Sequence, residues 1–130
     1  MIVVDTSTWI AFIAGENAED VRELDRRLAD KHVLMAPVVL TELLSESKLP
    51  SAIQTALLEL PLAEIHSGYW QRAGELRAKI LAQKRRARLG DVLIAQTCMD
   101  HEAPLLTRDR DFRSFAEASG LRLVKYASVK

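Results

Sequence analysis

The sequence of 130 residues has very few of the features that define several large classes of protein. Its single cysteine, Cys98, excludes a disulfide framework and a cysteine-built zinc site, and favours a reducing compartment. No apolar run approaches the roughly 20 residues that a membrane-spanning helix needs. Asp5 interrupts the apolar stretch at the N-terminus, which is not typical of a signal peptide. We therefore expect a cytoplasmic protein that does not bind membranes.

The composition is that of an ordinary globular domain. Hydrophobic residues make up 48% of the chain and charged residues 28%, which excludes a disordered chain. There are no repeats, low-complexity tracts or linkers. Residues 1–130 are therefore predicted to form a single domain.

The formal net charge of zero conceals an uneven distribution. Residues 1–65 contain 5 Lys and Arg against 11 Asp and Glu, whereas residues 66–130 contain 13 against 7. The densest basic stretch lies between Lys79 and Arg88 and contains no acidic residue. Such a stretch is either a solvated helix surface or a local positive field that attracts a polyanion. Neutrality alone therefore does not exclude a nucleic-acid partner.

Short apolar runs alternate with amphipathic stretches along the whole chain. This pattern predicts an α/β fold, with a short central parallel sheet of about five strands covered by helices on both faces. The predicted strands comprise residues 2–4, 33–35, 62–65, 104–107 and 121–124.

Four acidic residues occupy positions that such a sheet brings together. Asp5 ends the first strand, and Asp109 follows the fourth. Asp91 comes directly after Gly90, at the start of a helix that is apolar on almost every face, and Glu42 lies in the helix after the second strand. Because sites in open α/β sheets form beyond the carboxyl ends of the strands, we expect these carboxylates to converge.

Each acid also has a structural interpretation by itself. Asp91 could cap its helix, Glu42 could lie on a helix surface, and Asp109 could belong to a turn. Asp5 is harder to explain in this way, because it directly follows a buried strand. The convergence of all four therefore favours a functional site.

Four carboxylates within about 5 Å would repel one another by roughly 3 kcal/mol per close pair, so a cation or protons must neutralise them. Oxygen ligands without Cys or His favour Mg²⁺, with Mn²⁺ as a substitute. This chemistry supports metal-assisted hydrolysis of a phosphodiester. The hydroxyls of Ser7 and Thr107 belong to the same edge, where they either hold a ligand or water or cap helices.

Four segments in the same order resemble a known family. Residues 4–7 (VDTS), 41–44 (TELL), 90–95 (GDVLIA) and 106–112 (LTRDRDF) are similar to the motifs of PIN-domain ribonucleases, and among these to the VapC toxins of toxin–antitoxin pairs. The resemblance covers the whole chain. It implies a Mg²⁺-dependent endoribonuclease toxin that forms a homodimer and is neutralised by a VapB-like antitoxin, whose tail occupies the active-site groove.

The resemblance also assigns roles to individual residues. It implies that Asp5, Glu42, Asp91 and Asp109 are the catalytic and metal-binding acids. Ser7 and Thr107 match supporting hydroxyl positions. Asp111 is a further acid that either supports the site or, as we favour, caps the helix that follows it.

The basic residues are predicted to surround these acids and to bind RNA phosphates without reading sequence. The seven aromatic residues fall mostly on apolar helix faces, which argues against stacking platforms and favours recognition of RNA shape and backbone. The predicted RNA-binding residues are Lys84, Arg85, Arg86, Arg88, Arg108 and Arg110.

Two other functions are consistent with parts of this pattern. One is a PIN-domain nuclease that acts in RNA processing or on flapped DNA outside a toxin–antitoxin pair. The other is a non-catalytic α/β binding module, which a broken set of acids would favour. For the homodimer, the apolar faces of helices at residues 38–44 and 53–60 are the predicted contacts.

Overall fold

The computed structural model describes residues 1–126 and contains a three-stranded parallel sheet with the order β2-β1-β3. The central strand pairs in register with both neighbours, so that Ile2 lies opposite Val33 and Val4 opposite Leu106. Its β-branched residues are almost fully buried, as expected for a strand covered on both faces. The strands are β1 (Ile2–Val4), β2 (Val33–Leu34) and β3 (Leu105–Leu106).

The prediction of about five strands is wrong, because the two outer segments form only isolated bridges. Leu62 bridges to Met35 beyond β2, and Leu123 bridges to Leu105 beyond β3. The neighbouring strands are two residues long, so they offer no ladder along which a further strand could extend. Leu62 is also 52% exposed, so burial does not hold the segment after α4 against the sheet.

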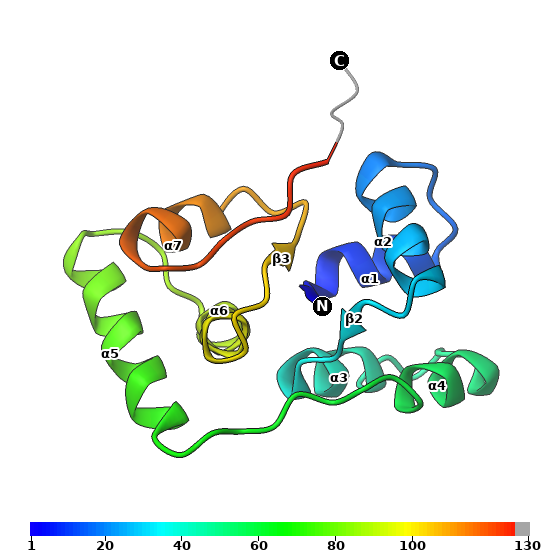
Figure 1. Cartoon of the computed structure of the whole chain (residues 1–130), viewed down its shortest axis with the longest axis horizontal. Helices are drawn as coiled ribbons and strands as arrows, with labels where there is room; N and C mark the ends of the chain where they lie inside the picture. The colour runs from blue at the N-terminus through cyan, green and yellow to red at the C-terminus, as the bar shows by residue number, and fades with distance from the viewer. Residues whose placement is uncertain (127–130) are drawn as a thin grey trace.

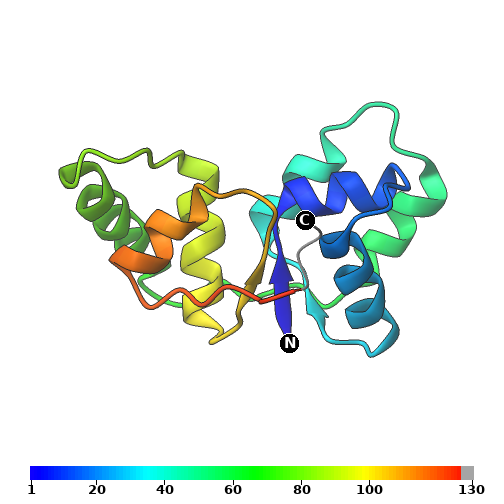
Figure 2. The ribbon, with the colours of Figure 1, turned by 90° about the horizontal axis from the view of Figure 1, so that it is seen from above.

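Helices flank the sheet on both sides. Figures 1 and 2 show α1 to α4 on one side of the strands and α5 to α7 on the other. None of the helices within residues 1–126 combines the length and apolar character required to cross a membrane. The helices are α1 (Thr6–Ile13), α2 (Glu19–Ala29), α3 (Pro37–Leu44), α4 (Ser51–Leu58), α5 (Tyr69–Ala82), α6 (Leu89–Asp100) and α7 (Phe112–Ala118).

Helix α6 packs against α3, α5 and α7, as its apolar composition predicts. Val92, Ala95 and Cys98 are among its almost fully buried residues. The hydroxyl of Tyr69 in α5 donates a hydrogen bond to the carbonyl of Leu93 at 2.7 Å. This packing fixes the first turn of α6, and therefore Asp91, relative to the sheet.

Candidate active site

Asp5 lies at the carboxyl end of β1 and is only 4% exposed. Its N–H donates to the carbonyl of Leu106, which continues the pairing between β1 and β3. Its Oδ2 accepts hydrogen bonds from the hydroxyls of Ser7 at 2.6 Å and Thr107 at 2.9 Å. Burial raises the pKa of Asp5, and these hydrogen bonds to the charged form limit the rise. Both hydroxyls that the sequence indicated therefore contact this carboxylate.

Thr107 connects Asp5 to Asp109. Its hydroxyl donates to Asp5 and accepts a hydrogen bond from the N–H of Asp109 at 2.9 Å. The Oδ1 of Asp109 in turn accepts from the N–H of Asp111 at 2.9 Å. Asp111 occupies the N-cap position of α7, but its side chain forms no capping hydrogen bond. The loop after β3 is therefore ordered around the carboxylates.

Asp91 lies in the first turn of α6 and is partly buried. Burial and the negative charges of Asp5 and Asp109 raise its pKa to about 6, against the opposing charge of Arg88. Glu42 adds a smaller effect in the same direction. Like charges that raise a pKa must be close together, so these residues form one electrostatic group.

Glu42 in α3 is exposed, yet its carboxylate is held toward the other acids. Its Oε1 accepts a hydrogen bond from the hydroxyl of Thr6 at 2.7 Å. A Cβ atom at Gly90 would lie 3.7 Å from its Oε2. The Glu42 carboxylate is therefore next to the start of α6, one residue before Asp91.

The donor set at this edge of the sheet consists of carboxylate and hydroxyl oxygens. Within residues 1–126, no three acidic, His or Cys side chains converge closely enough to form a complete metal-binding group. Burial and then the neighbouring carboxylates raise the pKa of Asp91, and the charge of Arg88 offsets this only in part. The chemistry of the residues therefore fits a hard divalent cation, although their present arrangement is not a closed ligand set.

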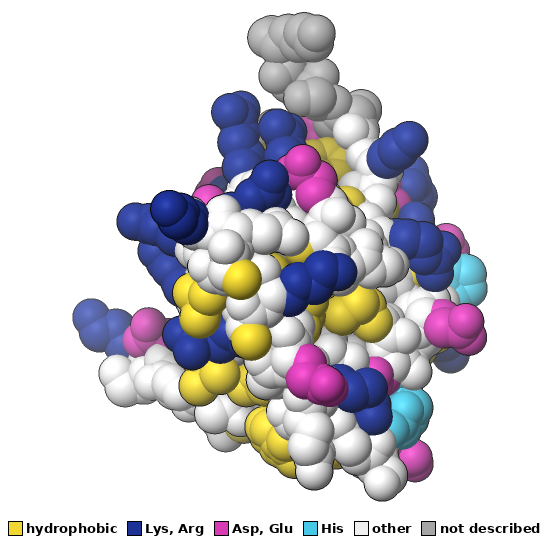
Figure 3. Space-filling view, turned by 90° about the vertical axis from the view of Figure 1, so that its left-hand side faces the viewer, with side chains coloured by type: hydrophobic (Ala, Val, Ile, Leu, Met, Phe, Trp, Pro, Cys, Tyr) yellow, Lys and Arg dark blue, Asp and Glu magenta, His cyan; other side chains and the backbone are white. Residues whose placement is uncertain are grey.

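Four of the predicted RNA-binding residues lie in the loop between α5 and α6, namely Lys84, Arg85, Arg86 and Arg88. Arg88 occupies the N-cap position of α6, and its positive charge lowers the pKa of Asp91. Arg85 forms an ion pair with Glu117 of α7 at 3.3 Å. Lys84 and Arg86 are exposed. Lys and Arg side chains are spread over the face formed by α5 and α7, with acidic side chains between them (Figure 3).

Arg108 has a structural role that the sequence did not indicate. Its guanidinium forms a bidentate ion pair with buried Asp20 of α2, at 2.8 and 3.0 Å, and also bonds to Glu16 at 3.1 Å. Burial acts against the charged form of Asp20, but hydrogen bonds from Arg108 and Thr8 hold its pKa below the usual range. The predicted RNA-binding role of Arg108 requires a free guanidinium, and here the side chain connects the β3 loop to α2.

Asp20 itself was missed by the sequence analysis, although a signal exists. It lies four and eight residues before Leu24 and Leu28, and therefore on the apolar face of α2. An acid on such a face requires a buried partner. The partner, Arg108, is 88 residues away along the chain, so no local pattern identifies it.

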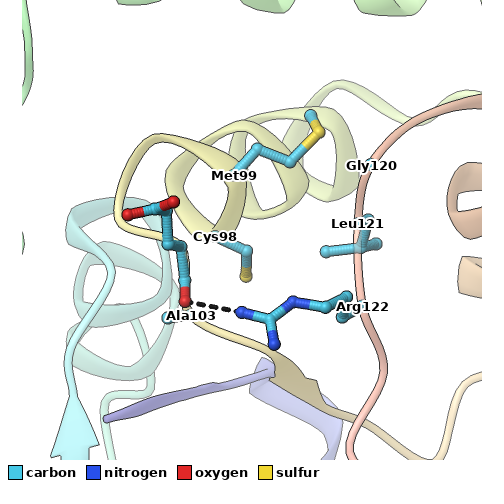
Figure 4. A pocket seen from close by; sticks show the side chains of 7 residues that line it. Cys98, Met99, Ala103, Gly120, Leu121 and Arg122 are labelled. Atoms are coloured by element: carbon cyan, nitrogen blue, oxygen red, sulfur yellow. Dashed lines mark hydrogen bonds between the residues drawn. The ribbon is translucent and has the colours of Figure 1, made fainter.

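A separate pocket of about 540 Å³ lies at the C-terminal end of α6 (Figure 4). Cys98 and Leu121 contribute to its lining, and Arg122 donates a hydrogen bond to the carbonyl of Glu102. Burial raises the pKa of the Cys98 thiol, which makes it unreactive. This pocket contains none of the residues predicted for the site.

The fold and the group of acids agree with one protein family. The PIN domain profile matches residues 2–118 of the chain. The chain therefore belongs to the PIN domain family.

Particular relatives within this family are VapC proteins. The chain is 24% identical to Ribonuclease VapC11 of Mycobacterium tuberculosis, over 97% of this chain and 99% of the relative. The VapC ribonuclease Mb1587 of Mycobacterium bovis has the same identity and coverage.

Solved structures show the same fold. VapBC2 from Rickettsia felis, bound to a DNA fragment from its promoter, superimposes with a TM-score of 0.75 at 22% identity and covers 98% of this chain and 100% of its own. VapC20 of Mycobacterium tuberculosis, described as a sarcin-ricin loop cleaving toxin, has a TM-score of 0.64 at 22% identity and covers 94% and 99%.

Proposed function

We propose that the chain is a VapC-type endoribonuclease toxin that hydrolyses RNA phosphodiester bonds with Mg²⁺. The observation that supports this most directly is the arrangement of Asp5 and Asp109 around the Thr107 hydroxyl at the carboxyl edge of a PIN fold. Asp91 in the first turn of α6 adds a third carboxylate, whose pKa the other two raise. Relatives that match over nearly their whole length are named as ribonucleases.

The proposed mechanism assigns the four acids to the binding of Mg²⁺. Asp5, Asp91, Asp109 and Glu42 would supply oxygen ligands. A cation held there would supply Lewis-acid chemistry that favours hydrolysis of a phosphodiester. The hydroxyls of Ser7 and Thr107 hold the Asp5 carboxylate in one orientation and favour its ionised form.

The remaining contacts prepare the site before a substrate binds. Thr6 orients Glu42, and the N–H of Asp111 orients Asp109. Because hydrogen bonds from the start of α1 and from the loop after β3 fix these two carboxylates, little reorganisation is required when charge develops during the reaction.

We also propose that a VapB-like antitoxin covers the acids from the α1 and α3 side. A groove of about 390 Å³ lies there, and Ile10, Ile13 and Leu43 contribute its apolar surface while Glu42 and Glu46 add negative charge. Ile10 is 57% exposed, which is unusual for a large apolar side chain beside a candidate site. The surface fits an apolar segment with a basic residue that reaches Glu42. Structural relatives include VapBC complexes.

A homodimer, and action in the cytoplasm, complete the proposal. The predicted dimer contacts included α4, on which Leu58 is 56% exposed. Leu62 and Ile65 follow α4 along the chain and are 52% and 43% exposed. Trp70, at the start of α5, is 62% exposed. These side chains offer apolar area that a second copy would bury.

RNA cleavage by the purified chain tests the function. We expect cleavage with Mg²⁺ or Mn²⁺, loss of cleavage with EDTA, and at least a hundredfold lower rate for Asp5→Asn. Asp25→Asn is the matched control, because Asp25 is exposed on α2 and the substitution is chemically the same. Undiminished cleavage by Asp5→Asn would contradict the assignment, and cleavage of flapped DNA alone would favour the other class of PIN nuclease.

A further inference from the structure

A pocket of about 530 Å³ opens beside Asp109. Residues 107–110 form one wall, Arg113 of α7 contributes a second, and residues 123–126 form a third. Asp109 belongs both to this wall and to the group of acids. Thr107 belongs to the same wall and donates a hydrogen bond to Asp5. The pocket and the candidate active site therefore share an edge.

The third wall is held in place by pairing with β3. The N–H of Leu105 donates to the carbonyl of Arg122, and the N–H of Val124 donates to the carbonyl of Leu105. Because this bridge is parallel, Lys125 and Tyr126 reach the same carboxyl edge at which Asp5 and Asp109 lie.

Tyr126 is the aromatic residue that this arrangement brings to the site. Its hydroxyl donates to the carbonyl of Thr107 at 3.1 Å, which limits rotation of the side chain. Its ring is only partly buried and lines the pocket. An aromatic ring with one fixed end and an accessible face is suited to stacking against a base.

Three of the positive charges that line the pocket are not paired with an acid among the described residues. Arg110, Arg113 and Lys125 are exposed and line it, and none of them forms an ion pair with another residue in the range 1–126. Arg108, which also lines it, is neutralised by Asp20 and Glu16. The surface formed by Arg110, Arg113 and Lys125 therefore attracts anions.

We propose that this pocket binds the nucleotide next to the cleaved bond of a single-stranded RNA, with phosphates on Arg113 and Lys125 and a base stacked on Tyr126. The proposal rests on the proposed ribonuclease function. The volume lies within the range of small-molecule sites and suits one nucleotide. Stacking requires an unpaired base, so the pocket selects single strands over duplexes.

The test measures binding of a fluorescently labelled ten-nucleotide single-stranded RNA to the Asp5→Asn chain with Mg²⁺, at several salt concentrations. Arg113→Gln and Lys125→Gln should each weaken binding and reduce the slope of log Kd against log salt by about 0.7. Tyr126→Leu should weaken binding about 5- to 150-fold with little change in slope, whereas Tyr126→Phe should bind nearly as well as the parent. Lys31→Gln is the control, because Lys31 lies near the opposite edge of the sheet, just before β2.

The possible outcomes distinguish a failure of the pocket assignment from a failure of the ribonuclease proposal. If the unsubstituted chain cleaves RNA but the three pocket variants bind it with the parent's affinity and salt slope, the pocket assignment is wrong and the ribonuclease proposal stands. If the unsubstituted chain neither binds nor cleaves RNA, both proposals fail. If the variants lose affinity for the antitoxin and keep it for RNA, the pocket is a protein-docking site and the nucleotide assignment is overturned. Circular dichroism of each variant confirms that the fold is intact.

Discussion

The hydroxyl of Thr107 donates a hydrogen bond to the Asp5 carboxylate across 102 residues of sequence, at 2.9 Å. This contact joins the loop after β3 to the end of β1. It stabilises the ionised form of a carboxylate whose burial favours the protonated form.

Removing this hydroxyl should impair the enzyme without unfolding it. We expect Thr107→Val to lower kcat/KM for RNA roughly 10- to 100-fold, because a hydrogen bond to a charged group contributes about 1.5–3 kcal/mol. The pKa of Asp5 should rise, so the acidic limb of the pH–rate profile should move to higher pH. Thr107→Ser keeps the hydroxyl and should restore most of the activity. Full activity in Thr107→Val together with a loss in Thr107→Ser would show that the methyl group matters instead.

The ion pair between Arg108 and Asp20 should stabilise the fold. Arg108→Gln leaves a buried carboxylate with Thr8 as its remaining side-chain partner, so we expect the free energy of unfolding to fall by about 2–4 kcal/mol. Urea denaturation measures this. Arg110→Gln is the neighbouring control and should have little effect. Adding Asp20→Asn to Arg108→Gln should recover part of the loss, and a further loss in the double variant would contradict the pairing.

The stability of the metal-free chain should depend on pH through Asp91. The pKa of Asp91 is raised to about 6 in the folded state, so the folded chain binds a proton that the unfolded chain has released between about pH 4 and 6. The resulting stabilisation is complete below pH 4 and is lost as the pH rises through 6. We expect the free energy of unfolding to fall by about 1–3 kcal/mol over this range because of Asp91, with solvent screening taken into account.

Asp91→Asn isolates that effect. The difference in unfolding free energy between the variant and the parent, both in EDTA, should grow in favour of the variant from pH 4 to pH 7. Addition of Mg²⁺ should stabilise the parent at pH 7 more than the variant. A pH-independent difference would mean that Asp91 titrates normally.

Two glycines should respond in opposite directions to alanine. Gly74 lies inside α5 with open space around it, so Gly74→Ala should stabilise the chain by about 0.4–1 kcal/mol. Gly15 also has open space, but its φ of +75° is costly for alanine, so Gly15→Ala should destabilise by about 1 kcal/mol. Thermal unfolding of the two variants measures both effects. If both variants were stabilised, the space around each glycine rather than its backbone conformation would determine the effect of alanine.

The sequence predicts the centre of the fold well and its edges poorly. β1 and β3 are short apolar runs buried on both faces, and β2 is a short apolar run buried on one face and partly buried on the other, which is a strong local signal. The segments at Leu62 and Leu123 have a similar composition, but they lie outside strands too short to pair with them over more than one bridge. Strand pairing depends on the neighbour, which local composition does not describe.

The same distinction applies to the site. The proximity of Asp5, Asp91 and Asp109 could be predicted, because each follows a strand or begins a helix at one edge of a parallel sheet. The commitment of Arg108 to Asp20 could not be predicted, because the two residues meet only through the tertiary structure. The assignment of the acids to Mg²⁺ stays a prediction for the experiments above.

The brevity of β1 has an evolutionary consequence. Val4 is buried in the hydrophobic core and directly precedes Asp5, so a core residue and a candidate catalytic residue are adjacent in the sequence. A substitution that opens a small cavity under Val4 or Leu106 moves the acids as well as weakening the fold. Loss-of-function variants selected at random should therefore map to the core strands as often as to the acids, and many of them should still fold.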